Sequence, residues 1–338
     1  MTVLHILGNP NVVAHIDNRI DPFSIAVVKF IDNMTKKGWD CIHYGIKGCQ
    51  VNCKTEIVLS TLSTNYQKNV ETYNLNAGNA IIKNKKPGDL ILCFYGWDNK
   101  GAADMNPDCI VVEPSIGYTT NAVFSPYRIF VSYALMHFFY GERNMLMNPS
   151  WTDAVIPNAF TPSEFEFSEN KKDYFLYFGR VIDTKGVQIA IEATRQTDKK
   201  LYIAGPGNIS DIGYDAIPEH VTILGPCNSE QRKILMRDAC AIIGPTLYIE
   251  PFGNMVVEGY FSGTPSITTD WGGFTETVVN GVTGFRCRDL NDVVHAIENI
   301  NSIDPHTCRK WADENYSETV VHEKFDNYFK KLLNNIRI

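Results

Sequence analysis

The chain has 338 residues, of which 44% are hydrophobic and 20% are charged, values typical of a globular protein with sizeable cores. At roughly 100–200 residues per domain this length favours two domains, and the composition excludes a disordered chain, a coiled coil and a small disulfide scaffold. The formal net charge of −7 argues against a nucleic-acid coat or a polybasic membrane clamp, while a local basic pocket stays possible.

The cysteines and the N-terminus bear on metal binding and location. The nine cysteines are scattered, and no CxxC motif or Cys/His set has the spacing of a zinc site. The first residues, MTVLHILGNP, lack the basic and apolar regions of a signal peptide. The most apolar stretch, residues 129–140, has about 12 residues and is too short to span a bilayer. We therefore expect a cytoplasmic protein with reduced thiols and no transmembrane segment.

The N-terminal part of the chain alternates strands and helices. A buried strand over residues 3–7 ends at the turn sequence Gly8-Asn9-Pro10. A helix is predicted next, with Asp21 as its N-cap and Pro22 at its first position. This alternation predicts a parallel sheet that is covered on both faces. Further buried strands are predicted at residues 41–44, 89–94 and 109–112.

Residues 150–172 interrupt this alternation. They hold Pro-Asn and Thr-Pro pairs and a charged run, which predict a linker. Beyond the linker the alternation resumes, with one helix opening near Gly186 and another opened by Asn228. Apolar residues at helical spacing between 318 and 338 predict a C-terminal helix. The predicted strands of this part are residues 174–178, 201–204, 221–224 and 241–244.

The predicted architecture is therefore α/β, with two doubly wound, Rossmann-like domains. We assign residues 1–155 to the first domain and residues 156–315 to the second. The C-terminal helix, residues 316–338, is expected to cross back to the first domain.

Ligands of doubly wound sheets bind at the carboxyl ends of the strands, so the loops that follow predicted strands are the candidate sites. In the segment FGRVIDTKG, residues 178–186, Arg180 and Lys185 stand at the mouth of a helix. Two cations beside a positive helix N-terminus suit a diphosphate. Because cationic side chains at helix starts are common on surfaces, this segment alone does not identify a site.

The segment EPFGNMVVE, residues 250–258, follows another predicted strand. Its Pro-Phe-Gly turn exposes backbone N–H groups at a helix start. A helix that begins near Asn254 places Glu258 roughly 6 Å along the axis, where a carboxylate can accept ribose hydroxyls. Glu250, before the helix, would face a sugar. Taken alone, the two glutamates fit a solvated helix N-terminus equally well.

A third segment, residues 263–285, carries Gly-Thr-Pro, Gly-Gly and Asn-Gly pairs around a short apolar strand. Glycines in tight turns allow a close backbone approach to a ligand or to a neighbouring loop. Together and in this order, the three segments resemble the retaining GT-B glycosyltransferases of family 4, the glycogen-synthase-like nucleotide-sugar transferases. The E-x7-E element from Glu250 to Glu258 is the most specific match, and the sequence VIPNA at residues 155–159 is similar to the family's interdomain signature, with Ala where Gly is usual.

The resemblance is strong over about residues 150–320 and covers the N-terminal half only by architecture. It implies two domains that face each other across a cleft, the first binding the acceptor and the second the donor. The implied catalytic residues are Glu250, Arg180 and Lys185: the glutamate would contact the transferred sugar, and the two cations would hold the diphosphate. Glu258 would bind the ribose. The other implied donor contacts are Gly205, Phe252, Gly253 and Asn254.

The resemblance also implies a reaction. A hexose would move, with retention of configuration, from GDP-mannose, UDP-glucose or UDP-GlcNAc to a glycan or another hydroxyl acceptor. No metal or other cofactor is expected, because Arg, Lys and a helix N-terminus can do the charge work of Mg²⁺. No protein nucleophile and no nucleic-acid partner is expected either, and the sequence leaves the oligomeric state open.

The N-terminal half departs from the family pattern. The turn after the first strand lacks the frequent Gly-Gly pair, and no clear match exists for the histidine that the family often carries late in this domain. His137 lies in an apolar run and is predicted to be a core histidine. The candidates for a loop that faces acceptor or donor are Gly8, His15, Ser115 and Tyr118.

Two alternatives stay open at this level. A nucleotide-sugar-binding protein without transferase activity is the main one, because the expected histidine is missing. A dinucleotide oxidoreductase is disfavoured, because the turn after the first strand contains no G-x-G-x-x-G.

Overall fold

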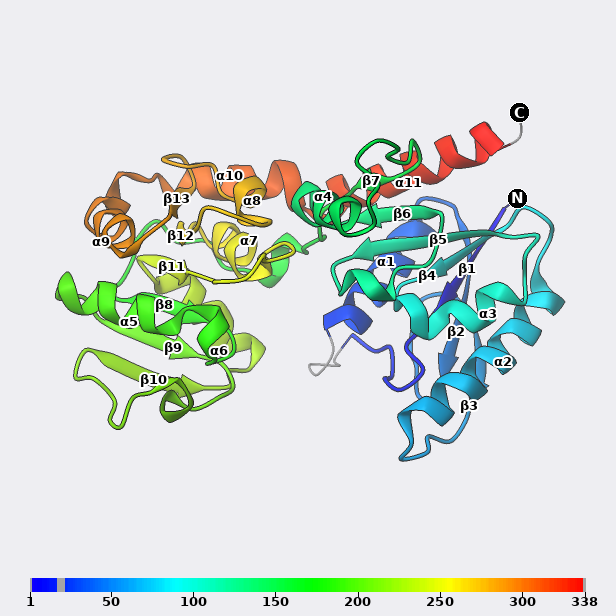
Figure 1. Cartoon of the computed structure of the whole chain (residues 1–338), viewed down its shortest axis with the longest axis horizontal. Coiled ribbons are helices and arrows are strands. Elements are labelled where there is room, and N and C mark those ends of the chain that lie inside the picture. The colour runs from blue at the N-terminus through cyan, green and yellow to red at the C-terminus, as the bar shows by residue number, and fades with distance from the viewer. Residues whose placement is uncertain (1, 17–21, 337–338) are drawn as a thin grey trace. The chain divides into compact units, whose positions relative to one another are not determined.

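The structure is a computed structural model that describes residues 2–16 and 22–336. Within those ranges the strands form two parallel sheets, one of seven strands and one of six, and helices pack against both (Figure 1). The predicted α/β class with two doubly wound sheets is confirmed. Each sheet belongs to one of two compact units. The first unit comprises Met1–Val131, Phe139–Ala159 and Val321–Ile338, and the second comprises Ser132–Phe138 and Phe160–Val320.

The units divide the chain less simply than the predicted domains do. The prediction placed the boundary after residue 155, whereas the main part of the second unit begins at Phe160. The C-terminal helix α11 (Glu318–Ile336) contributes its first residues to the second unit and the remainder, from Val321, to the first.

The sheet of the first unit has the order β3-β2-β1-β4-β5-β6-β7 with every neighbour parallel. The chain winds outward from β1, returns beside β1 at β4 and winds outward the other way, which is the doubly wound topology. The strands are β1 (Val3–Leu7), β2 (Asp40–Ile46), β3 (Lys54–Leu59), β4 (Leu90–Cys93), β5 (Ile110–Ile116), β6 (Tyr127–Phe130) and β7 (Ala154–Val155). The helices are α1 (Pro22–Lys36), α2 (Tyr66–Asn84) and α3 (Lys100–Asp104), together with the last residues of α4 (Tyr133–Glu142), whose residues up to Phe138 belong to the second unit.

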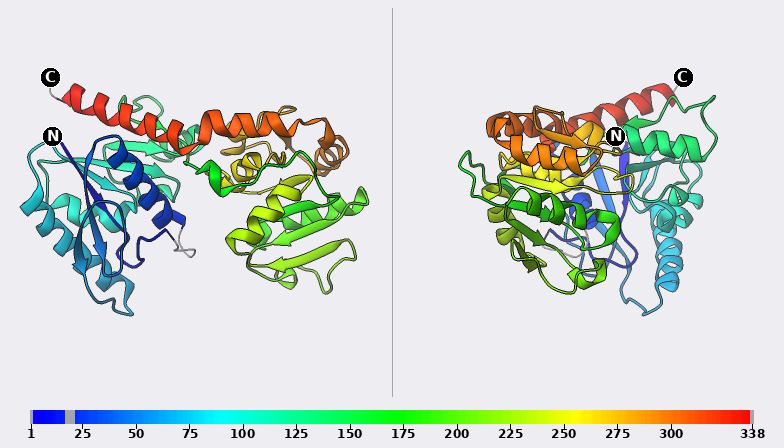
Figure 2. Two further views of the ribbon diagram at one scale, coloured as in Figure 1. Left: turned by 180° about the vertical axis from the view of Figure 1, so that it is seen from behind. Right: turned by 60° about the vertical axis from the view of Figure 1, so that its left-hand side comes forward.

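Both faces of this sheet are covered because successive strand residues point to opposite sides. Leu4 and Ile6 of β1 join a buried cluster with residues of α1 and α11. Val3 and Leu7 join a second cluster with residues of α2 and α3. Figures 1 and 2 show the same layering, with α2 and α3 on one face of the sheet and α1 on the other.

Three local expectations in the first unit have different outcomes. Helix α1 begins at Pro22 as predicted, while its expected cap, Asp21, lies outside the described residues. The apolar run 129–140 divides into the end of β6 and most of α4. Helix α2 was not predicted, because its buried face includes polar residues, among them Asn69 and Asn74.

The second unit repeats the topology with the order β10-β9-β8-β11-β12-β13, again all parallel. The four strands predicted here are present. The predicted cap Asn228 opens a helix, and it accepts a hydrogen bond from the backbone N–H of Gln231. The strands are β8 (Phe175–Phe178), β9 (Leu201–Ala204), β10 (Val221–Gly225), β11 (Ala241–Gly244), β12 (Ser266–Thr269) and β13 (Gly284–Cys287). The helices are α5 (Val187–Gln196), α6 (Ser229–Asp238), α7 (Asn254–Phe261), α8 (Phe274–Thr277), α9 (Leu290–Asn299) and α10 (Pro305–Tyr316).

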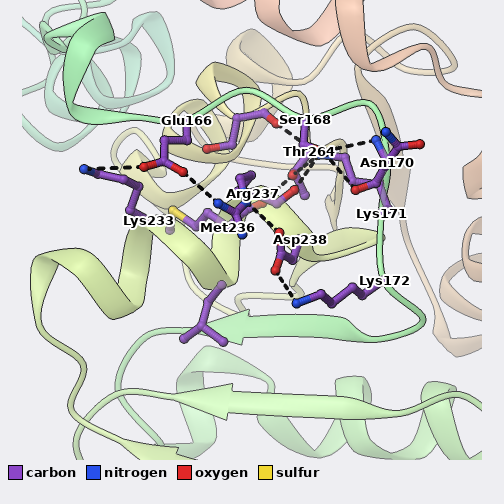
Figure 3. Close-up of polar contacts among 12 residues, drawn as sticks. Glu166, Ser168, Asn170, Lys171, Lys172, Lys233, Met236, Arg237, Asp238 and Thr264 are labelled. Carbon is purple, nitrogen blue, oxygen red and sulfur yellow. Dashed lines mark hydrogen bonds and ion pairs between the residues drawn. The ribbon is translucent and has the colours of Figure 1, made fainter.

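The segment that enters the second unit is fixed to the C-terminal end of α6 (Figure 3). Glu166 forms an ion pair with Arg237 at 2.7 Å, and Lys172 forms one with Asp238 at 2.7 Å. Between them, the Lys171 ammonium donates to the backbone carbonyl of Arg237 at 2.9 Å. Residues 166–172 of the predicted linker therefore pack on the C-terminal end of α6 and fix it in place.

Two further observations concern the chain as described. No helix within residues 2–16 and 22–336 is both long and apolar enough to cross a membrane. All nine cysteines are free thiols there.

Candidate functional site

The loops that follow β8 and β11 meet at the switch point of the second sheet. These strands are neighbours, with Ala241 opposite Phe175, so their loops leave the same edge of the sheet. The backbone N–H of Leu247 donates to the carbonyl of Thr184 at 2.9 Å. Gly186 lies against the other loop so closely that a Cβ there would come within 2.0 Å of the Pro245 oxygen. The fold thus brings the first two candidate segments together.

We call the place where the loops after β8 and β11 meet the junction. Lys185 and Glu250 form its centre. The lysine ammonium lies 2.6 Å from the carboxylate oxygen Oε2. The hydroxyl of Tyr248 donates to the same oxygen at 3.0 Å, and the ammonium lies 4.7 Å from the centroid of the Tyr248 ring. Burial lowers the pKa of Lys185, but the adjacent carboxylate outweighs burial and raises the pKa overall. The Lys185 ammonium is therefore held charged in a half-enclosed position.

The glycine-rich segment predicted to allow a close approach supports Glu250 from behind. The backbone N–H of Gly273 donates to the Glu250 carbonyl at 2.7 Å. A Cβ on Gly272 would come within 2.7 Å of the Glu250 nitrogen. The indole N–H of Trp271 donates to the Tyr248 carbonyl at 3.2 Å. Glu250 of the second segment therefore contacts both the first segment, through Lys185, and the third, through Gly273.

Two helices present their N-termini at the same loops. Gly186 precedes α5 with φ of 68°, and Gly253 precedes α7 with φ of 87°. Neither cap residue has a side chain that can bond the first-turn N–H groups, so the helix ends keep their partial positive charge. This is the usual arrangement for binding a phosphate or another anion.

Arg180 adds a full positive charge to the first loop. It follows Gly179, and its carbonyl accepts a hydrogen bond from the Tyr177 hydroxyl at 2.7 Å. Its side chain is exposed, and it forms no ion pair with any described residue. The guanidinium is therefore available to a ligand, whereas the Lys185 ammonium is shared with Glu250.

The structure explains why glycine stands at position 205 and an aromatic residue at position 252. A Cβ on Gly205, whose φ is 144°, would come within 1.9 Å of the Gly179 oxygen. Only glycine therefore allows the loops after β8 and β9 to pass. The Phe252 ring is buried and stacks on Phe160 with centroids 6.4 Å apart. The Phe252 ring is therefore part of the core, which leaves only the backbone of this residue to contact a ligand.

Glu258 is buried on α7, and its carboxylate forms an ion pair with Arg232 of α6. The Arg232 guanidinium also lies 5.7 Å from the centroid of the Phe178 ring at the end of β8. Arg232 was missed in the sequence, although a signal was present. It falls on the same helical stripe as the buried Met236 and Ala239, and a charge on such a stripe needs a buried partner.

The candidates in the first unit lie in separate local contacts. Gly8 donates to the Tyr44 carbonyl at 3.0 Å, and a ring nitrogen of His15 lies 2.9 Å from the side-chain oxygen of Gln50. Ser115 has a φ of 57°, unusual for a residue other than glycine. The Tyr118 hydroxyl donates to the buried Glu113 at 3.0 Å, so this hydroxyl is engaged inside the first unit.

The prediction that His137 is a core histidine is wrong. His137 lies on α4 and is exposed, with the Tyr133 ring 6.0 Å away between centroids. The buried face of α4 is formed by other positions, Leu135 and Phe139 among them. The start of α4 is capped by Glu276 of the third segment, which accepts the backbone N–H groups of Tyr133 and Ala134 at 2.9 and 2.8 Å.

The described residues hold no group of three or more His, Cys, Asp or Glu side chains that is arranged to bind a metal ion. The charged side chains of the site are the cations Arg180, Lys185 and Arg232 and the carboxylates Glu250 and Glu258. Lys185 pairs with Glu250, and Arg232 pairs with Glu258.

Comparison with known proteins points to the same half of the chain. Residues 161–317 match the family described as "Glycosyl transferases group 1", and this range falls within the second unit. A glycogen synthase of Mycobacterium tuberculosis is 33% identical over 174 residues, which are 47% of this chain and 42% of that protein. The alpha-1,3/1,6-mannosyltransferase ALG2 of Dictyostelium discoideum is 29% identical over 169 residues, 50% of this chain and 36% of that one. The matched segments thus cover less than half of these two relatives.

The likeness to solved structures extends over both units. The crystal structure of Anabaena HepE in complex with UDP and glucose has a TM-score of 0.72 to this chain, and the match covers 98% of this chain and 100% of that one. The sequences are only 14% identical, so the likeness establishes the fold. That fold is the GT-B fold predicted from the sequence.

Proposed function

Because residues 161–317 match the family described as "Glycosyl transferases group 1", we propose that the chain is a retaining, metal-independent glycosyltransferase. The donor is a nucleotide sugar that carries a hexose, and the acceptor is a hydroxyl of a glycan or glycoconjugate. The observation that carries this proposal is the junction at the switch point, where Arg180 and the Lys185–Glu250 pair lie beside two helix N-termini.

The charges of this junction suit a nucleoside diphosphate. Arg180 and Lys185 would bind the two phosphates, and the first turns of α5 and α7 would add backbone N–H groups. Such a site stabilises the negative charge that develops on the leaving diphosphate, which is the charge that a metal ion would otherwise neutralise. This is the support for metal independence, and a chelator tests it.

The two glutamates would bind the uncharged parts of the donor. Glu250, held by Lys185 and Tyr248, would accept hydroxyls of the transferred sugar. Glu258 would accept ribose hydroxyls. In the proposed reaction the bond from the anomeric carbon to the diphosphate oxygen breaks, and a bond to the acceptor oxygen forms on the same face. The acceptor proton passes to the departing diphosphate, so no protein nucleophile takes part.

UDP-glucose, UDP-GlcNAc and GDP-mannose are the donors to be compared. The HepE structure contains UDP and glucose, and ALG2 is named a mannosyltransferase. These names support a hexose on a nucleoside diphosphate for this chain, and an assay has to choose among the three donors.

The test is release of nucleoside diphosphate from each of the three donors, with and without EDTA. We expect release from one donor that EDTA does not change, and a loss of about a hundredfold in Glu250→Gln, comparable to removing one transition-state contact. Product anomers, read by NMR, should show retention. If no donor releases nucleotide while the protein binds one, the chain is a binding protein without transferase activity. If it neither binds nor cleaves any donor, the proposal fails altogether.

A further inference from the structure

Arg232 occupies an unusual place on α6. Its neighbours on the helical stripe, Met236 and Ala239, are fully buried, and its own side chain is only 35% exposed. The Nε atom of its guanidinium is buried without a hydrogen-bond partner among the described residues. The Arg232 guanidinium is therefore held in a largely apolar position, which costs free energy unless its contacts compensate.

Arg232 touches Glu258 and Phe178, one on each side. One terminal nitrogen of the guanidinium pairs with Oε1 of Glu258, whose side chain is 11% exposed. The centre of the guanidinium lies 5.7 Å from the centroid of the Phe178 ring, within the range of a cation–π contact. These contacts restrict the guanidinium, and through it they restrict the carboxylate.

The backbone that carries Arg232 is also fixed. The C-terminal end of α6 is held by the ion pairs of Arg237 and Asp238 with Glu166 and Lys172 (Figure 3). The N-terminal end is closed by the reciprocal hydrogen bonds of the Asn228 capping box. A positioning residue needs such support, because a mobile cation would not define the rotamer of its partner.

The pairing leaves part of Glu258 unused. Arg232 engages Oε1, and no described residue hydrogen-bonds to Oε2. A carboxylate fixed through one oxygen presents the other in a defined direction, and hydrogen bonds to a carboxylate oxygen are among the stronger ones in proteins.

We propose that Arg232 is a positioning residue that holds Glu258 so that its second carboxylate oxygen accepts the ribose hydroxyls of a nucleoside diphosphate. This rests on the proposed function, since it assigns the ribose to Glu258. Arg232 itself does not touch the reacting atoms. It sets the selectivity for a ribonucleotide over the corresponding deoxyribonucleotide.

The test compares UDP with 2′-deoxy-UDP, and GDP with 2′-deoxy-GDP, by calorimetric titration of the full chain. For the nucleotide that binds, the wild-type protein should prefer the ribose form by about tenfold or more, as expected for hydrogen bonds to a charged group. In Arg232→Met, binding of the ribonucleotide should weaken by a similar factor while binding of the deoxy form changes little, so the ratio approaches one. Arg232→Gln removes the charge at similar size and should lower the ratio in the same direction if the Met variant does not fold.

The matched control is Lys233→Met, which removes the next cation on α6. Lys233 pairs with Glu230 at 3.2 Å and Glu166 at 3.9 Å, so this variant should keep the wild-type ratio. In donor cleavage, Arg232→Met should raise KM with little change in kcat. A folded Arg232 variant that keeps the full ribose preference overturns the proposal and leaves Arg232 as a structural ion pair. If the wild-type protein binds neither UDP nor GDP, it is the proposed function that fails.

Discussion

At the scale of single residues, the junction depends on pairs rather than on isolated groups. Lys185 and Glu250 were assigned separate roles in the sequence, one for the diphosphate and one for the sugar, but each is the other's nearest charged partner at 2.6 Å. Replacing either residue leaves a half-buried charge without its partner, which is costly. Their effects on catalysis are therefore expected to be non-additive.

Lys185→Met should lower the rate of donor cleavage by about 10²–10³, because it removes a cation from the leaving diphosphate and releases Glu250. The rate of donor cleavage in the Lys185→Met/Glu250→Gln double variant should lie within about tenfold of the rate in the slower single variant. Lys199→Met is the control, since Lys199 lies on the surface and pairs loosely with Asp173 at 3.6 Å. Full additivity of the two losses would show that the residues act independently.

Glu113 predicts a pH dependence in the first unit. It is fully buried and accepts the backbone N–H groups of Phe124 and Ser125 at 2.9 and 2.7 Å. Burial raises its pKa from 4.5 to about 7. The folded state therefore keeps a proton that the unfolded chain loses above pH 4.5, so the stability from this group falls as the pH rises towards 7.

Glu113→Gln keeps the shape and the acceptor but removes this titration. The free energy of unfolding of the variant should rise relative to wild type by about 3 kcal/mol between pH 4.5 and 7, because the pKa of Glu113 is raised to about 7 in the folded state. Urea unfolding followed by circular dichroism at several pH values measures the difference. A difference that stays flat or falls over this range would contradict the prediction.

At the scale of elements, the site is formed where neighbouring strands end, and glycines decide how closely their loops approach. Gly186 and Gly205 would each place a Cβ within about 2 Å of a backbone oxygen, a distance that real Cβ atoms do not reach. Substitution at these positions should therefore move the loop that carries Lys185. A glycine can be required because its φ is positive, or because a Cβ would clash with a neighbouring backbone atom, and the two requirements can be tested separately.

Gly186→Ala and Gly213→Ala make the comparison. Both glycines have positive φ, of 68° and 86°, but a Cβ on Gly213 would meet nothing within 4 Å. Gly213→Ala should cost about 1–2 kcal/mol of unfolding free energy from backbone strain alone. Gly186→Ala should cost more and should also weaken nucleotide binding by at least about tenfold, because the loop is displaced. Equal effects of the two variants on binding would contradict this role for Gly186.

Lys171 is a half-buried residue of the segment 166–172 that is fixed to the C-terminal end of α6. Its ammonium donates to the carbonyls of Arg237 and Ser262 at 2.9 and 3.0 Å and to the Thr264 hydroxyl at 2.8 Å. Burial lowers its pKa to about 8. Lys171→Met leaves these acceptors without a donor and should destabilise the protein by about 2–4 kcal/mol. Lys172→Met, with a side chain that is 69% exposed, should cost less than about 1 kcal/mol in the same thermal or urea unfolding. The reverse order would show that the segment 166–172 depends on its surface pairs.

At the scale of the whole molecule, the sequence predicted two doubly wound sheets and the loops that follow their strands. Strands such as 3–7 and 241–244 are short apolar runs between turns, so their periodicity is visible without tertiary information. Helix α2 was missed because buried asparagines replace part of its apolar stripe, and these asparagines form hydrogen bonds with residues elsewhere in the unit. Asn74, for example, donates to the Asp98 carbonyl.

The sequence predicted which segments form the site, but it did not predict which of their charged side chains pair with one another. Strand order places the loops after β8 and β11 side by side, and this order does not follow from chain order. The Lys185–Glu250 and Arg232–Glu258 pairs are consequences of that placement. His137 was misjudged because a helix of mostly apolar residues does not show which side is buried.

Calorimetric titration of the full chain with UDP and with GDP tests the central claim most directly. We predict that one of the two nucleotides binds, and that Arg180→Ala weakens this binding by about tenfold or more, since a guanidinium–phosphate contact is lost. Arg195→Ala, which removes another exposed arginine that pairs with Glu192 at 2.6 Å, should leave the affinity unchanged. A folded protein that binds neither nucleotide, or whose affinity is the same in Arg180→Ala, would contradict a donor site at this junction.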